Sequence, residues 1–83
     1  MELNDRTQQF IEKMGLSFER LGGTRTAGRM LGLLLMAENP LSLTEIGELL
    51  QLSKASISTN ARTAEQIGLV QPVQEARQRP ALL

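Results

Sequence analysis

Apolar side chains recur at helical intervals near the start of the chain. Phe10, Met14 and Phe18 lie four residues apart, which places them on one face of a helix. Asn4 and Asp5 are both good N-terminal caps for this helix, and a pair of glycines ends it. The pattern therefore predicts an amphipathic first helix.

The next stretch, 27–37, reads AGRMLGLLLMA and is apolar on nearly every side. Such a pattern is typical of a central, buried helix. Thr24 is its predicted cap, and Pro40 prevents the residue before it from continuing the helix. Gly28 and Gly32 fall on one face, where the absence of side chains permits another helix to come close.

Two shorter helices follow a brief extended segment, LSL, at 41–43. Thr44 is the predicted cap of the first and Ser53 of the second. Leu52 precedes the second cap and Ile57 lies at the fourth helical position, which is the spacing of a hydrophobic staple. A tight turn is therefore expected between these helices, and a glycine ends the second.

The last part of the chain is predicted to form strands rather than a helix. It predicts a strand at 69–75, a turn at 76–80 and the start of a returning strand at 81–83. Pro72 confines the first strand to a sheet edge, and Pro80 is expected to interrupt the second.

The order of these elements predicts the fold. Two short helices joined by a tight turn and followed by a strand and its return are the parts of a helix-turn-helix with a β-wing. The expected fold is mainly α, a winged helix-turn-helix with four helices and a short or incomplete β-wing. At 83 residues the chain has room for one such domain, 1–83.

The amino-acid composition argues against several classes of function. The chain has no Cys and no His, so it has neither disulfides, thiolate metal sites nor the commonest general base. No run approaches the roughly 18 apolar residues of a membrane span, and the polar start MELNDRTQQF does not resemble a signal peptide. We therefore expect a cytoplasmic protein that is not an enzyme, needs no cofactor or metal and does not enter a membrane.

The placement of polar residues, rather than the net charge of zero, indicates a nucleic-acid site. In a helix-turn-helix the second helix, here about 53–67, lies in the major groove of double-stranded DNA, and its first residues meet the bases. Ser53 would hold a phosphate, and Lys54 would meet a phosphate or a guanine edge. The residues predicted to contact DNA are Ser42, Thr44, Ser53, Lys54, Ser56, Ser58, Thr59, Arg62, Arg77 and Arg79.

Each of these residues also has a purely structural interpretation. Ser53 is first of all a helix cap. The hydroxyl residues of this helix, together with Lys54 and Arg62, are also what an ordinary solvated face would carry. Arg77 and Arg79 lie near the chain end, where order is often lost. The spacing and order of the elements favour the DNA-binding interpretation, whereas no single residue does so by itself.

From about Leu16 to Val70 the chain resembles the GbsR branch of the MarR-type winged-helix regulators. SKASISTNAR is similar to the recognition helix of that branch, and TAGRMLGLLLMA to its preceding helix. The resemblance implies a cytoplasmic bacterial or archaeal transcription regulator, usually a homodimer on a palindromic operator, and some relatives sense small-molecule effectors such as choline. By position it implies that the DNA is read by Ser53, Lys54, Ser56, Ser58, Thr59 and Arg62.

The chain departs from this family after Glu75. Members continue through a full β-wing and C-terminal helices that form much of the dimer, whereas EARQRPALL is a poor wing end. A complete wing and those helices are therefore expected to be missing, and a homodimer would use the first helix and the face with Gly28 and Gly32. An alternative function follows: a wingless protein-interaction module that dimerises with a regulator and modulates it, which the zero net charge also favours.

Overall fold

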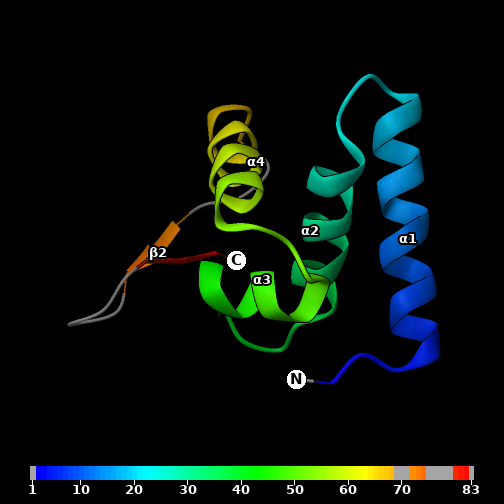
Figure 1. The fold of residues 1–83 in the computed structure, drawn as a ribbon, viewed down its shortest axis with the longest axis horizontal. Coiled ribbons are helices and arrows are strands. Elements are labelled where there is room, and N and C mark those ends of the chain that lie inside the picture. Colours follow the sequence, from blue (N-terminus) through cyan, green and yellow to red (C-terminus); the bar gives the residue numbers. More distant parts are fainter. Residues whose placement is uncertain (1, 69–71, 75–79, 83) are drawn as a thin grey trace.

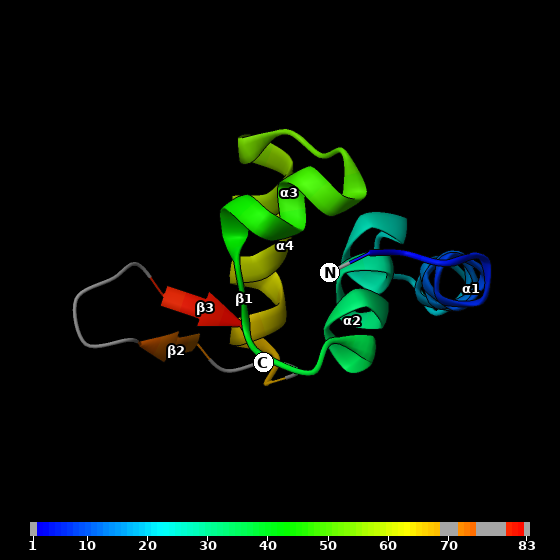
Figure 2. The same cartoon turned by 90° about the horizontal axis from the view of Figure 1, so that it is seen from below.

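The computed structural model describes residues 2–68, 72–74 and 80–82, and four helices and three short strands lie within them (Figure 1). In chain order these are α1 (Asp5–Arg20), α2 (Arg25–Met36), β1 (Leu41–Ser42), α3 (Leu43–Leu50), α4 (Lys54–Gln66), β2 (Pro72–Gln74) and β3 (Pro80–Leu82). Helix α2 lies between α1 on one side and the α3–α4 pair on the other (Figures 1 and 2).

Helices α1 and α2 form an antiparallel hairpin. Asn4 is the cap of α1, because its side-chain oxygen accepts a hydrogen bond of 2.8 Å from the Thr7 backbone N–H. Gly22, at φ 94°, adopts the left-handed conformation that turns the chain after α1. Thr24 then caps α2 by accepting from the Ala27 backbone N–H at 3.0 Å, as the sequence predicts.

The glycine face of α2 is packed against α1. A Cβ atom at Gly28 would lie 2.8 Å from both the Gly15 Cα and the Phe18 Cβ, and it would also meet the Met14 carbonyl oxygen. A Cβ atom at Gly32 would lie 3.1 Å from the Ile11 Cα. The predicted close helix approach is confirmed. The expectation that this face forms a dimer interface is wrong, because α1 of the same chain fills it.

The core lies where α1, α2 and α3 converge. Ile11, Leu33 and Ile46 are its largest fully buried side chains, one from each helix. Burying a side chain of this size contributes about 1.5–3 kcal/mol relative to leaving it in water. Helix α2 is central, as predicted, but it is not buried on every side, because Leu35 is 61% exposed and Met36 is 43% exposed.

Helix α3 begins two residues earlier than the sequence suggests. Ser42, not Thr44, is its cap: the Ser42 hydroxyl accepts from the Glu45 backbone N–H, and the Glu45 carboxylate accepts from the Ser42 backbone N–H, both at 3.1 Å. This reciprocal pair is a capping box. The prediction of a Thr44 cap is wrong because Ser42 has the extended backbone that a cap requires, whereas Thr44 already lies inside the helix.

The three strands form an antiparallel sheet in the order β1-β3-β2. Strand β3 is central, with Ala81 opposite Ser42 on one side and Val73 on the other. Pro72 lies in the edge strand β2, as predicted. Pro80 does not interrupt β3: it is the first residue of the strand and pairs only with Gln74, so its missing N–H breaks no bond to β1.

The paired strands β2 and β3 form a short β-wing, which contradicts the description of the chain as wingless (Figure 2). They lie on the side of α3 and α4 that faces away from α1 (Figure 2). The predicted fold class, a winged helix-turn-helix with four helices and a short wing, is confirmed.

Candidate nucleic-acid interface

A turn of three residues joins α3 to α4. Gln51 adopts the left-handed conformation at φ 57°, and the Leu52 N–H donates to the Gly47 carbonyl oxygen at 3.0 Å. A left-handed conformation is costly for a residue other than glycine, so the surrounding contacts must hold it. The turn fixes the direction in which α4 leaves α3.

The start of α4 is fixed by a cap and by an apolar contact. The Ser53 hydroxyl accepts from the Ser56 backbone N–H at 3.1 Å, which confirms Ser53 as the predicted cap. Leu52 is half-buried and Ile57 is 3% exposed, and both belong to the lining of one hollow between α3 and α4. A Cβ atom at Gly47 would lie 2.6 Å from the Ile57 Cδ1, so Ile57 occupies the space that the glycine leaves.

Helix α4 has one buried side and one exposed side. Its buried residues are Ile57 and Ala61. The exposed residues include most of the predicted DNA contacts, which are Ser53, Lys54, Ser58, Thr59 and Arg62. Ser56 is only half-buried. The structure therefore gathers the predicted residues of α4 on the surface that the protein core does not use.

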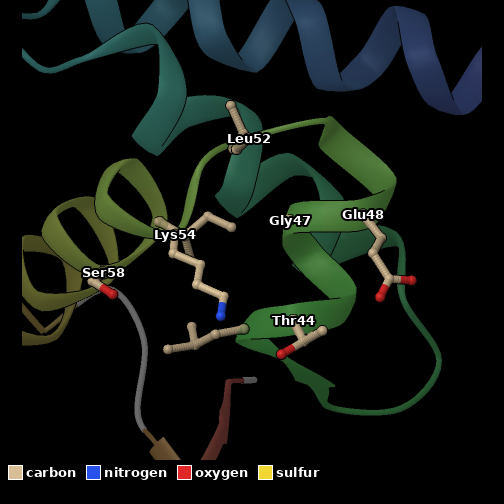
Figure 3. A pocket seen from close by; sticks show the side chains of 8 residues that line it. Thr44, Gly47, Glu48, Leu52, Lys54 and Ser58 are labelled. Carbon is tan, nitrogen blue, oxygen red and sulfur yellow. The ribbon is translucent and has the colours of Figure 1, made fainter.

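A hollow of about 450 Å³ separates the first turns of α3 and α4 (Figure 3). Its floor is apolar and its rim carries Thr44, Lys54 and Ser58. In Figure 3 the Lys54 side chain extends from α4 toward the start of α3, where Thr44 lies, while the Glu48 carboxylate points away. Two hydroxyls and an ammonium group in the N-terminal halves of two helices form a rim that suits a phosphate.

Basic side chains on α4 are available to a ligand. Within the described residues, neither Lys54 nor Arg62 pairs with an acidic side chain. The ion pairs among those residues join the two helices of the hairpin, Arg25 to Glu19 and Arg29 to Glu12, each at 2.9 Å. The hydrogen bond and the charge of Glu19 raise the pKa of Arg25. The hairpin therefore pairs Arg25 and Arg29 with its own glutamates, whereas Lys54 and Arg62 of α4 have no such partner within these residues.

The other predicted contacts are Ser42, Arg77, Arg79 and Thr44. Ser42 is 7% exposed, and its hydroxyl caps α3, so it is not placed to touch a ligand. Arg77 and Arg79 lie outside the described residues. Thr44, by contrast, is exposed on the rim of the hollow.

One polar contact near this surface is not evident from the sequence. The Thr24 hydroxyl donates to the Asn60 side-chain oxygen at 2.6 Å, which joins the start of α2 to the middle of α4. The only local signal is an asparagine in a helix interior, where this residue is unfavourable. Its partner is 36 positions away, so spacing along the chain does not reveal the contact.

The described residues contain neither a candidate metal site nor a candidate membrane span. In the described part of the chain, no three His, Cys, Asp or Glu side chains are grouped so as to hold a metal ion. No helix within the same residues is long and apolar enough to cross a membrane.

Comparison with known proteins agrees with this geometry. The model of the MarR family matches residues 21–79. The chain is 42% identical over 64 residues to the HTH-type transcriptional regulator MmpR5 of Mycobacterium tuberculosis, a match that covers 76% of this chain and 39% of that protein. A crystal structure described as a transcriptional regulator superposes with a TM-score of 0.85 and 37% identity, over 93% of this chain and 53% of that one. The chain thus spans about half or less of the length of these two proteins.

Proposed function

This chain belongs to the MarR family, and we propose that it is the sequence-specific DNA-binding module of a transcriptional regulator, with α4 in the major groove. The observation that carries the proposal is the rim formed by Thr44, Lys54 and Ser58. These side chains come from the two helices of a helix-turn-helix and are exposed. A duplex that meets both helices would place a phosphate beside them.

Short side chains on α4 support a base-reading role. Ser58 and Thr59 are exposed, and each hydroxyl can both donate to and accept from a base edge. Small residues also let the helix approach the floor of the groove. Arg62 lies one turn beyond Ser58 and is long enough to reach a phosphate or a guanine edge. In this arrangement Lys54 and Arg62 supply affinity, and the hydroxyls supply preference.

The wing extends the proposed contact. Strands β2 and β3 pair beside α3 and α4, and the segment between them contains Arg77 and Arg79. We propose that these arginines touch the flanking minor groove or its phosphates. The alternative of a wingless interaction module rested on the absence of a wing, so the observed β2–β3 pairing removes its main support.

The proposal extends to the assembly that acts on DNA. A chain with nine basic residues and zero net charge is expected to bind DNA weakly by itself, so a homodimer on two half-sites would give useful affinity. The first helix is the candidate interface, because Leu16 is 41% exposed and Leu21 is 86% exposed on it or at its end. The similarity of SKASISTNAR to the GbsR branch supports a cytoplasmic member of that branch with a small-molecule effector. The length of 83 residues supports a single domain, 1–83.

A binding titration tests the proposal. Fluorescently labelled duplexes would be enriched from a random pool by the chain itself, then titrated at about 50 mM and 200 mM salt. We expect affinity to fall steeply as salt rises, and a scrambled duplex to bind at least about tenfold more weakly. Equal binding to both duplexes, or the absence of any binding at low salt, would contradict the proposal.

A further inference from the structure

One hydrogen bond links the start of α2 to the middle of α4. Thr24 caps α2 by accepting from the Ala27 N–H, and its own hydroxyl hydrogen is donated to the Asn60 Oδ1 at 2.6 Å. Thr24 therefore holds the end of one helix and a side chain of another at the same time. Oxygen–oxygen separations near this value are typical of good O–H···O bonds.

The other end of the Asn60 side chain is also engaged. Its Nδ2 donates to the Ser56 carbonyl oxygen at 2.8 Å, one turn earlier in α4. Because that carbonyl can only accept, it fixes the nitrogen toward α4 and the oxygen toward α2. The side chain therefore forms an oriented bridge between the backbone of α4 and the cap of α2.

Apolar packing leaves room at this place. A cavity of about 250 Å³ lies between α2 and α4, beside Thr24 and Asn60. The buried residues of α4 are Ile57 and Ala61, and Ala61 has only a methyl group to fill space. A close-packed contact would fix the angle between these helices, but this one is incompletely filled. The Thr24–Asn60 bond is a directional contact between the two helices beside this cavity.

We propose that Asn60 is a positioning residue for DNA reading, and that its bond to Thr24 sets the orientation of α4 relative to the hairpin. Thr59 and Asn60 are neighbours on α4: Thr59 faces solvent and Asn60 faces α2. A change of angle at Asn60 would therefore displace the exposed residues from the base edges they meet. The inference rests on the proposed DNA-binding function.

Four variants separate positioning from capping and from general helix stability. Asn60→Ala removes the bridge and leaves the Thr24 cap intact. Thr24→Asp keeps a capping oxygen but has no proton to donate, and Thr24→Ser keeps both functions. Thr63→Ala is the matched control, because its hydroxyl donates only to the Thr59 carbonyl oxygen within α4.

Two measurements are made on the full chain. Residual dipolar couplings of ¹⁵N-labelled protein report the angle between α2 and α4 without DNA. Anisotropy titrations give the ratio of affinities for an enriched duplex and its scrambled form. The ratio is the decisive quantity, because a charge introduced at position 24 affects both duplexes alike.

We expect Asn60→Ala and Thr24→Asp to alter the α4 couplings and to lower the affinity ratio about fivefold, which corresponds to the net contribution of one hydrogen bond. Thr24→Ser and Thr63→Ala should match the unmodified chain in both measurements. Unchanged couplings and an unchanged ratio in Asn60→Ala would overturn the inference. If Asn60→Ala does not fold, Thr24→Asp decides by the same criteria.

Failure of the proposed function would be distinguishable from failure of this inference. If the unmodified chain does not discriminate between duplexes, the proposed function is wrong, and an altered α4 orientation in Asn60→Ala would still establish the bridge. If the unmodified chain discriminates and both bridge variants keep the full ratio, the function stands and the positioning role is wrong.

Discussion

The hairpin of α1 and α2 and the pair of α3 and α4 are held together in different ways. In the hairpin the backbones approach so closely that Gly28 has no room for a Cβ atom. Between α3 and α4, caps and a strained turn fix the geometry, and a hollow of about 450 Å³ remains open. The hairpin thus excludes ligands by close packing, whereas α3 and α4 keep polar side chains available at their first turns. Stability and recognition are therefore expected to depend on separate residues.

The largest expected effect is a loss of stability when the α1–α2 hairpin is altered. Gly28→Ala should lower the free energy of unfolding by about 3 kcal/mol, because the added methyl group meets backbone atoms that cannot move aside. That is a large share of the roughly 4–12 kcal/mol expected for a chain of this length. Urea denaturation followed by circular dichroism measures it.

Gly32→Ala provides the control for this prediction. Its added Cβ atom would meet Ile11 and Met14 at 3.1–3.3 Å, which a small shift relieves. Alanine is also preferred over glycine in a helix by about 1 kcal/mol. Gly32→Ala should therefore change stability much less than Gly28→Ala. Equal stabilities for the two variants would show that the hairpin is less tightly packed than the structure indicates.

The second prediction concerns the exposed surface of α4. Replacing Lys54 and Arg62 together by alanine should weaken DNA binding about tenfold to a hundredfold and reduce the salt slope by about 1.8 if both contact phosphate. The unfolding temperature should be unchanged, because both side chains are exposed and make no ion pair among the described residues. Anisotropy titrations at several salt concentrations and a thermal melt measure the two quantities.

Removing two positive charges from the hairpin instead of from α4 is the control. Lys13 and Arg20 are exposed on α1. Their double alanine variant should bind DNA nearly as well as the unmodified chain. If it lost as much affinity as the α4 variant, binding would depend on total charge rather than on the surface of α4.

Features that depend on near neighbours in the sequence were predictable. The caps at Thr24 and Ser53 and the staple of Leu52 and Ile57 each involve residues at most five positions apart. Helix periodicity likewise places Ile57 and Ala61 inward and Lys54 and Arg62 outward. The exposed surface of α4 therefore follows from a local pattern.

Features that depend on distant contacts were not predictable in the same way. The pattern shows that Gly28 and Gly32 admit a helix, but it does not say whether that helix belongs to the same chain. The Thr24–Asn60 bond spans 36 positions. Pro80 was expected to break a strand, but its register leaves it opposite Gln74 alone, and register is set by tertiary pairing.

The third prediction separates a structural residue from a proposed contact within α3. Ser42→Ala should lower the free energy of unfolding by about 1–2 kcal/mol, because it removes the buried acceptor of the capping box. Thr44→Ala should change stability by less than about 0.5 kcal/mol, since Thr44 is exposed. Denaturation and DNA titrations on both variants give the comparison.

The expected pattern for DNA binding is the reverse. Thr44→Ala should weaken binding severalfold, and folded Ser42→Ala should bind with the same salt slope as the unmodified chain. A normal affinity in Thr44→Ala would show that Thr44 does not contribute to the proposed phosphate site. A reduced salt slope in Ser42→Ala would restore Ser42 as a contact despite its burial.

The smallest expected effect tests whether the hairpin needs its ion pairs. Glu19 raises the pKa of Arg25 through a hydrogen bond and its charge, but both side chains are 53% exposed. A raised pKa of a cation stabilises the folded state below the pKa of the unfolded chain, and this contribution is lost only as pH rises through the higher pKa of the folded state. Arginine stays protonated throughout the range from about pH 6 to pH 9, so the pair cannot make stability depend on pH there. Because water screens an ion pair this exposed, Glu19→Gln should leave the unfolding temperature nearly unchanged, and equally so at every pH in this range, as measured by thermal melts. A fall of more than about 4 °C would mean that charge pairing, and not only the close approach at Gly28, holds the two helices together.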